Sequence, residues 1–144
     1  MNIEVSIKGF HSHRFVVRYK QFEQKQFINL YAFPANYLSQ LARSLDVELD
    51  PMTGVIVGKV LGESPVRLDA LADHSALNNA RDFYFDKKGR LLGANNMTDP
   101  KFGTYVIFNV PKGRSLLQGS DANGVLRYQS SVRMSESSIT VLAE

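Results

Sequence analysis

The sequence predicts a mainly β protein, in which an antiparallel β-sandwich follows a small N-terminal β-meander and one short helix. Two observations carry this prediction. Short segments that alternate apolar and polar residues recur along the chain, and turn residues separate them. Helical spacing of apolar residues occurs in one short segment after Pro34. The chain has 144 residues, 44% of them hydrophobic, which is enough to bury one real core.

The N-terminal part begins with three alternating runs, at residues 4–8, 14–20 and 26–32. Residues 21–25 are polar and connect the second run to the third. Alternating runs joined by short polar connections are typical of neighbouring antiparallel strands. We therefore expect these three runs to form the meander.

The helical segment follows Pro34, and Asn36 is its candidate N-cap. Its apolar residues fall at i, i+3, i+4 and i+7, which places them on one face of a helix. These residues are Leu38, Leu41, Ala42 and Leu45. Residues 46–54 contain acidic residues, an Asp-Pro pair and a glycine, which indicates a connector. We therefore divide the chain into residues 1–50 and a sandwich domain of residues 51–144.

The strands of the second domain are predicted from β-branched or alternating runs that turn residues separate. These runs are residues 55–61, 66–72, 82–85, 104–110, 114–118, 125–132 and 138–142. The run at 104–110 follows a polar turn and stops at an Asn-x-Pro-x-Gly sequence. Proline removes a donor from a strand ladder and glycine permits a tight turn, so this stretch predicts a central strand and its end.

The run at 104–110 is apolar on both faces. We expect Tyr105 and Ile107 on one face, and Val106, Phe108 and Val110 on the other. A half-exposed strand would alternate apolar with polar residues, so this strand is predicted to be covered on both sides. We expect the helix near Leu38, or a neighbouring domain, to cover the second face. Deleting residues 1–50 should then expose apolar surface and promote association.

Several segments of the second domain resemble the carboxypeptidase regulatory-like domain, a transthyretin-like (prealbumin-like) β-sandwich of about seven strands. The resemblance covers roughly residues 54–118, and its segments are 54–60, 66–71, 98–105 and 109–113. The sequence departs from the family at Pro100–Phe102, which lengthen a turn, and at Ser115 and Leu116, where an aromatic residue is common. The resemblance implies a non-catalytic accessory module of a secreted, surface or envelope protein.

Composition argues against several classes of function. The net charge of +3 comes from 17 basic and 14 acidic residues, without the clustered basic and aromatic residues of a nucleic-acid-binding protein. The absence of cysteine excludes a disulfide framework and a thiolate metal site. No apolar run approaches the roughly 20 residues of a membrane helix. We therefore expect no nucleic-acid partner, no membrane insertion and no cofactor.

Two groups of residues are candidates for metal binding. His11 and His13 would share one face of a strand and could bind one metal ion, with His74 as the one further histidine. The simpler interpretation is a polar loop. Asp99 and Asp121 carry oxygen ligands that suit calcium, but their surroundings lack EF-hand spacing, and such residues commonly bond their own backbone in turns. We therefore expect no metal site.

Catalysis is not expected. The carboxylates of Asp82, Asp86 and Glu63 have no nucleophile beside them in sequence, and no Gly-x-Ser-x-Gly sequence occurs. The hydrolase branch of the transthyretin fold ends in Tyr-Arg-Gly-Ser, and residues 138–144 differ from it. Tyr84, Tyr105 and Tyr128 could stack on sugars, although aromatic residues on strands more often belong to the core.

The sequence therefore predicts a non-catalytic structural or protein-interaction module of a larger bacterial envelope or surface protein. The candidate interaction residues are Val106, Phe108, Tyr84 and Tyr128. The predicted partner is a protein or a neighbouring domain, with a glycan as the alternative. The first alternative function is a carbohydrate-binding module, and the second is a small hydrolase on the same fold. The expected location is the cell envelope or the exterior, as part of a longer exported protein, with the cytoplasm as the alternative.

Overall fold

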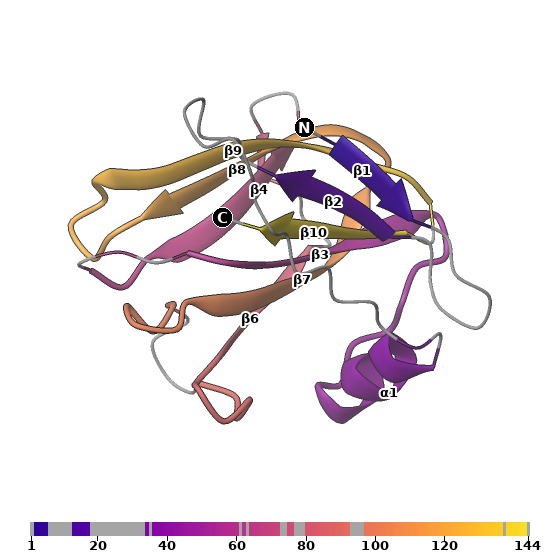
Figure 1. Ribbon diagram of the computed structural model, residues 1–144, viewed down its shortest axis with the longest axis horizontal. Coiled ribbons are helices and arrows are strands. Elements are labelled where there is room, and N and C mark those ends of the chain that lie inside the picture. Colours follow the sequence, from indigo (N-terminus) through magenta and orange to yellow (C-terminus); the bar gives the residue numbers. More distant parts are fainter. Residues whose placement is uncertain are drawn as a thin grey trace, which may run out of the picture.

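The computed structural model describes residues 2–5, 13–17, 34, 36–60, 62, 64–72, 75–76, 80–92, 97–136 and 138–143. Two β-sheets pack face to face, and one short helix lies on the far side of the larger sheet (Figure 1). The predicted mainly β sandwich is therefore confirmed.

The six-stranded sheet has the order β1-β2-β10-β3-β7-β6. Its strands are β1 (Asn2–Val5), β2 (His13–Val17), β10 (Ile139–Ala143), β3 (Thr53–Lys59), β7 (Thr104–Pro111) and β6 (Arg81–Phe85). The four-stranded sheet has the order β5-β4-β8-β9. Its strands are β5 (Ser75–Ala76), β4 (Arg67–Ala72), β8 (Gly113–Ser120) and β9 (Leu126–Met134). The strands predicted for the second domain agree with these bounds to within two residues, and β5 was not predicted.

Strand β10 departs from the antiparallel pattern of the other pairs. It lies between β2 and β3 and runs parallel to both. Strands β1 and β2 pair antiparallel as predicted, while the third strand of the predicted meander, residues 26–32, lies outside the described residues. Because β2 bonds to β10, this N-terminal hairpin extends the large sheet. The division of the chain at residue 50 stays a prediction.

Helix α1 (Tyr37–Ser44) forms where the apolar spacing predicts it, and Leu38 and Ala42 are buried. Asn36 occupies the N-cap position, as predicted, but its φ and ψ are helical and its side chain makes no capping hydrogen bond. Asp46 follows the helix at φ 55°, a left-handed conformation that commonly ends helices.

Two apolar clusters form the core. The first fills the space between the sheets and contains Ile56, Leu68, Tyr84, Tyr105 and Leu117, among others. The second lies between α1 and the opposite face of the six-stranded sheet. It contains Leu38, Ala42, Val47, Val55, Phe85, Val106, Phe108, Ile139 and Val141. The six-stranded sheet is therefore buried on both faces where α1 crosses it.

A β-bulge interrupts β7 near its end. Val110 pairs with Gly54 and Ile107 pairs with Ile56, so two residues of β7 face one residue of β3. One of these two, Asn109, has φ 57°. The bulge reverses the alternation, and Val110 lies in the cluster between the sheets. The prediction that Val110 shares a face with Phe108 is therefore wrong, because alternation holds only where no residue is inserted.

Candidate functional site

Val106 and Phe108 face the helix and not solvent. Their exposed fractions are 5% and 0%, and both lie in one cluster with Leu38 and Ala42 of α1. The ring of Phe83 packs edge-on against Phe108, with a centroid separation of 5.9 Å. The expectation that the helix covers the second face of this strand is confirmed. These two candidate interaction residues thus contact their own chain.

Tyr84 links the two sheets through its hydroxyl group. The hydroxyl accepts a hydrogen bond from the Leu68 amide of β4 at 2.8 Å and donates one to Oδ2 of Asp82 at 2.7 Å. Burial raises the pKa of the Tyr84 phenol far above its usual value, and the negative charge of Asp82 adds to this effect. This tyrosine is therefore a neutral, buried connection between the sheets.

The three tyrosines considered for sugar stacking all belong to the core. Tyr84 and Tyr105 are fully buried, and Tyr128 keeps an exposed fraction of 7%. Stacking on a sugar needs an accessible ring face. The structure therefore places Tyr84 and Tyr128 where they serve packing and offer no ring face for a sugar.

The Asn109 bulge holds the segment that connects α1 to β3. The side-chain oxygen of Asn109 accepts from the Asp50 amide at 3.1 Å, and its side-chain nitrogen donates to the Glu48 carbonyl at 2.8 Å. A cavity of about 570 Å³ opens beside this junction. Its lining comprises Asp46, Val47, Glu48, Leu49, Asp50, Pro51, Arg81 and Asn109.

Three carboxylates and one guanidinium group make this cavity polar. The Asp50 carboxylate is engaged in the local turn, because Oδ1 accepts from the Met52 amide at 2.8 Å. The lining named above contains no hydroxyl, thiol or imidazole group that could act as a nucleophile. The cavity can receive a polar or cationic group, and its described residues supply charges and carbonyl oxygens for that purpose.

The aspartates weighed for calcium binding act in turns. The Asp121 carboxylate accepts from the amides of Asn123 and Val125 and from Nε of Arg127 at 2.8 Å. The bond from Arg127 is the main reason that the pKa of Asp121 lies below its usual value. Asp99 accepts from the Lys101 amide in the same way. Within the described residues, no group of three or more potential ligands could hold a metal ion.

The hypothesis of a metal site at His11 and His13 stays a prediction. His11 and His74 lie outside the described residues, and His13 is described only as part of the backbone of β2.

A surface that sequence inspection missed lies on the four-stranded sheet. The side that faces away from the core is formed by alternate residues of β4, β8 and β9, which we call the outer face. It comprises Arg67, Asp69, Leu71, Arg114, Leu116, Gln118, Ser120, Leu126, Arg127, Gln129, Ser131 and Arg133, where a bulge in β9 places Leu126 opposite Ser120. Polar residues at every second position of 127–133 are the sequence signal that could have indicated it.

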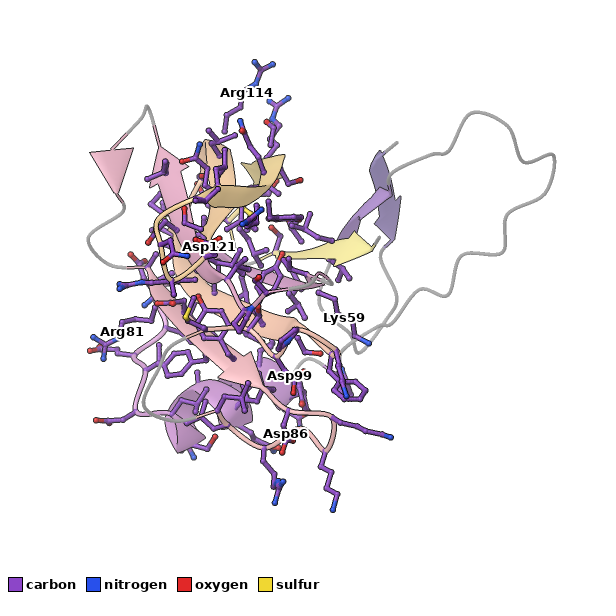
Figure 2. The ribbon with its side chains drawn as sticks, turned by 90° about the vertical axis from the view of Figure 1, so that its left-hand side faces the viewer. Lys59, Arg81, Asp86, Asp99, Arg114 and Asp121 are labelled. Atoms are coloured by element: carbon purple, nitrogen blue, oxygen red, sulfur yellow. The ribbon has the colours of Figure 1, made fainter. Side chains whose placement is uncertain are left out.

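The register arranges the outer face in cross-strand rows. Arg114 pairs with Arg133, Leu71 with Leu116, and Gln118 with both Asp69 and Gln129. Arg67 pairs with Ser120 at the other end. Figure 2 shows Arg114 projecting from one end of the molecule, far from Asp86 and Asp99 at the opposite end. Arginines thus lie near both ends of the face, two half-buried leucines lie between them, and the exposed Leu126 lies opposite Ser120.

Comparison with known proteins gives no assignment: no family model matches the chain, and neither a curated protein nor a solved structure shows significant similarity. Among the described residues, no helix has the length and apolar character needed to cross a membrane.

Proposed function

We propose that this chain is a non-catalytic structural or protein-interaction module of a larger bacterial envelope or surface protein, and that its sandwich is transthyretin-like. Strands β3, β4 and β6–β8 support the proposed fold, since they come from the region that carries the family resemblance and belong, with β9 and β10, to two packed sheets. The family implies an accessory role for such a domain.

The observation that carries the functional proposal is the burial of both faces of β7. The strand is buried from Tyr105 to Val110, with the second sheet on one side and α1 on the other. The apolar side chains of β7 therefore pack against other parts of the same chain and are not available to a partner. Among the described residues, the outer face of the four-stranded sheet is a regular and largely exposed surface on which a partner could bind.

The composition of the outer face favours a protein partner over a sugar. Arginine is enriched in protein interfaces, where apolar centres are surrounded by polar rims. Leu71 and Leu116 form such a centre, and arginines lie at both ends of the face. The described residues of this face include no aromatic ring on which a sugar could stack.

Site-specific photo-crosslinking in the native host tests the proposal. A benzophenone amino acid replaces Gln129 on the outer face, and in a matched control it replaces Gln40, which is exposed on α1. We expect a discrete protein adduct from only one of the two positions, Gln129 or Gln40. Adducts of equal yield and unchanged pattern from both positions would contradict a specific interaction module.

Two further assays address the alternatives. A glycan array that shows specific binding would favour the carbohydrate-binding module. Turnover of ester, phosphate or glycoside substrates that survives repurification and is lost on substitution of Asp82 would favour the hydrolase.

A further inference from the structure

We propose that the outer face of the four-stranded sheet binds an extended acidic segment of a partner protein, with an apolar residue near its centre. This inference rests on the proposed function, because it names the surface and the partner class of the interaction module. Four independent features of the face support it: charge, row spacing, the leucine pair and the position of Asp69.

The charge of the outer face is positive. It carries Arg67, Arg114, Arg127 and Arg133, and Asp69 is the acidic residue on it. Asp121 lies in the adjoining turn and pairs with Arg127. Arg114 and Arg133 are directly opposite each other. A carboxylate placed over this row would accept charge-assisted hydrogen bonds from a guanidinium group.

The spacing of the rows matches that of an extended peptide. Alternate residues of a strand lie about 6.8 Å apart, both in the sheet and in a peptide that runs along it. The first row is Arg114 with Arg133, and the second is Leu71 with Leu116. A segment laid along β8 can therefore place an acidic residue over the first row and an apolar residue over the second, two positions later.

The other two rows restrict the rest of the segment. Asp69 lies in the third row beside Gln118 and would repel a second carboxylate there. The side-chain amide of Gln118 in that row instead suits an uncharged polar residue. Arg67 lies in the fourth row and suits an acidic residue. The preferred segment is therefore acidic–x–apolar–x–polar–x–acidic, counted from the end at Arg114.

The leucine pair distinguishes a protein from a polyanionic glycan. Leu71 and Leu116 are half-buried on this face. A leucine or valine side chain of a peptide packs on them better than a sulfated or phosphorylated sugar, whose surface is dominated by charged and hydroxyl groups. The arrangement of apolar centre and arginine ends thus favours the peptide.

Fluorescence anisotropy with labelled peptides and the full chain tests the proposal. The probe is Glu-Thr-Leu-Thr-Ser-Thr-Glu, and its reversed sequence covers the opposite strand direction. A control peptide, Leu-Thr-Glu-Thr-Glu-Thr-Ser, has the same charge but places its acidic residues over the leucines and Asp69. We expect the probe or its reverse to bind at least about tenfold more tightly than the control peptide, with weaker binding at high salt.

Variants of the protein locate the binding. Arg114→Gln with Arg133→Gln should weaken probe binding at least about tenfold, while Arg43→Gln with Arg81→Gln removes the same charge elsewhere and should change it less than about twofold. All four arginines are exposed, so both variants should keep the fold. As a second readout, Leu116→Ser should weaken the probe but leave binding of a heparin oligosaccharide unchanged.

Three results would overturn the inference: equal loss in the two double variants, equal affinity for the probe and the control peptide, or tighter binding of the heparin oligosaccharide than of either probe. None of them would contradict the interaction module itself. That proposal fails only if the crosslinking experiment shows no site-dependent adduct, so failure of the inference and failure of the proposed function can be distinguished.

Discussion

The side-chain amide of Asn109 donates a hydrogen bond of 2.8 Å to the main-chain carbonyl of Glu48, far away in sequence. A second bond joins the Asp50 amide to the side-chain oxygen of Asn109. One residue therefore supplies both the left-handed backbone of the β7 bulge and the attachment of the segment that follows α1. The position of the helix on the sheet depends on this residue.

Replacing Asn109 should separate its two roles. Asn109→Ala should lower the free energy of unfolding by about 2–4 kcal/mol, because alanine tolerates the left-handed conformation poorly and the side-chain bonds are lost. Asn109→Gly relieves the backbone cost and should be the milder variant. Urea denaturation measures both. A glycine variant that is less stable than the alanine variant would contradict the assignment of backbone strain.

Removing the hydroxyl of Tyr84 should destabilise the protein. Tyr84→Phe leaves the buried Leu68 amide without its acceptor, and the expected cost is about 1–3 kcal/mol. Tyr37→Phe, at an exposed position of α1, is the control, and its unfolding free energy should change by less than about 0.5 kcal/mol. Thermal and urea unfolding at neutral pH measure the difference. Equal effects of the two substitutions would show that the link between the sheets contributes nothing.

Tyr84 should also shape the response to alkaline pH. Its folded pKa is raised above the ordinary value of 10.0, so the unfolded chain loses this proton first as the pH rises. The folded protein should therefore lose stability above pH 10, and Tyr84→Phe should flatten this part of the stability profile. Unfolding free energies measured from pH 8 to pH 11 test this. A profile of unchanged slope in the variant would assign the alkaline loss to other groups.

Acid should weaken the turn at Asp121. Its folded pKa is held below the ordinary value of 3.8 by Arg127, so its contribution to stability is present above that pH and is lost as the pH falls below it. Arg127→Gln should raise the pKa of Asp121 toward 3.8, because the main cause of the shift is removed. The pKa of Asp86, lowered chiefly by the backbone amide of Arg90, should not change. Carboxyl NMR titration follows both groups, and a parallel shift of Asp86 would indicate a general effect of charge.

A charge on the buried face of α1 should uncover the second core cluster. Leu38→Asp places a carboxylate among Val106, Phe108 and their neighbours, which favours release of the helix and exposure of apolar surface. We expect a lower melting temperature and concentration-dependent association in light scattering. Gln40→Asp, on the exposed face of the same helix, should remain monomeric. Identical behaviour of the two variants would mean that the helix does not protect this face.

Two glycines with positive φ should respond differently to alanine. Gly103 has φ 48°, and a methyl group there would collide with the main chain of Val60. Gly89 has φ 74° but open space around its Cα. Gly89→Ala should cost about 1–2 kcal/mol from backbone strain alone, and Gly103→Ala should cost clearly more. Chemical denaturation of both variants measures the two losses of unfolding free energy. Equal losses would contradict a steric contribution from Val60.

Much of the fold could be predicted because the patterns that indicate it lie within short stretches of the sequence. The apolar spacing from Leu38 to Leu45 indicated α1, and the double apolar face of 104–110 indicated a strand covered on both sides. The turn role of Asp121 followed from the tendency of aspartate to bond nearby amides. Each of these features depends on residues that are close in the chain.

Features that depend on distant partners were not predicted. The parallel pairing of β10 with β2 and β3 leaves no trace in a short apolar run, since any strand of that kind can pair with several others. The bulge at Asn109 depends on how β7 pairs with β3 near Gly54. An asparagine within a strand sequence does not by itself indicate such a bulge. The outer face required knowing that Arg114 and Arg133 are opposite each other. The candidate site was therefore less accessible to sequence inspection than the fold.

The place of β10 in the large sheet has a consequence for biosynthesis. Strand β2 can pair with β10, its second neighbour in the sheet, only after β10 has left the ribosome, when nearly all of the described chain has been made. Until then the N-terminal hairpin has an open edge, and two-stranded hairpins are marginal by themselves. Slow translation would prolong this exposed interval, and a truncation that removes β10 would make it permanent, so either change should favour self-association through the edge of β2.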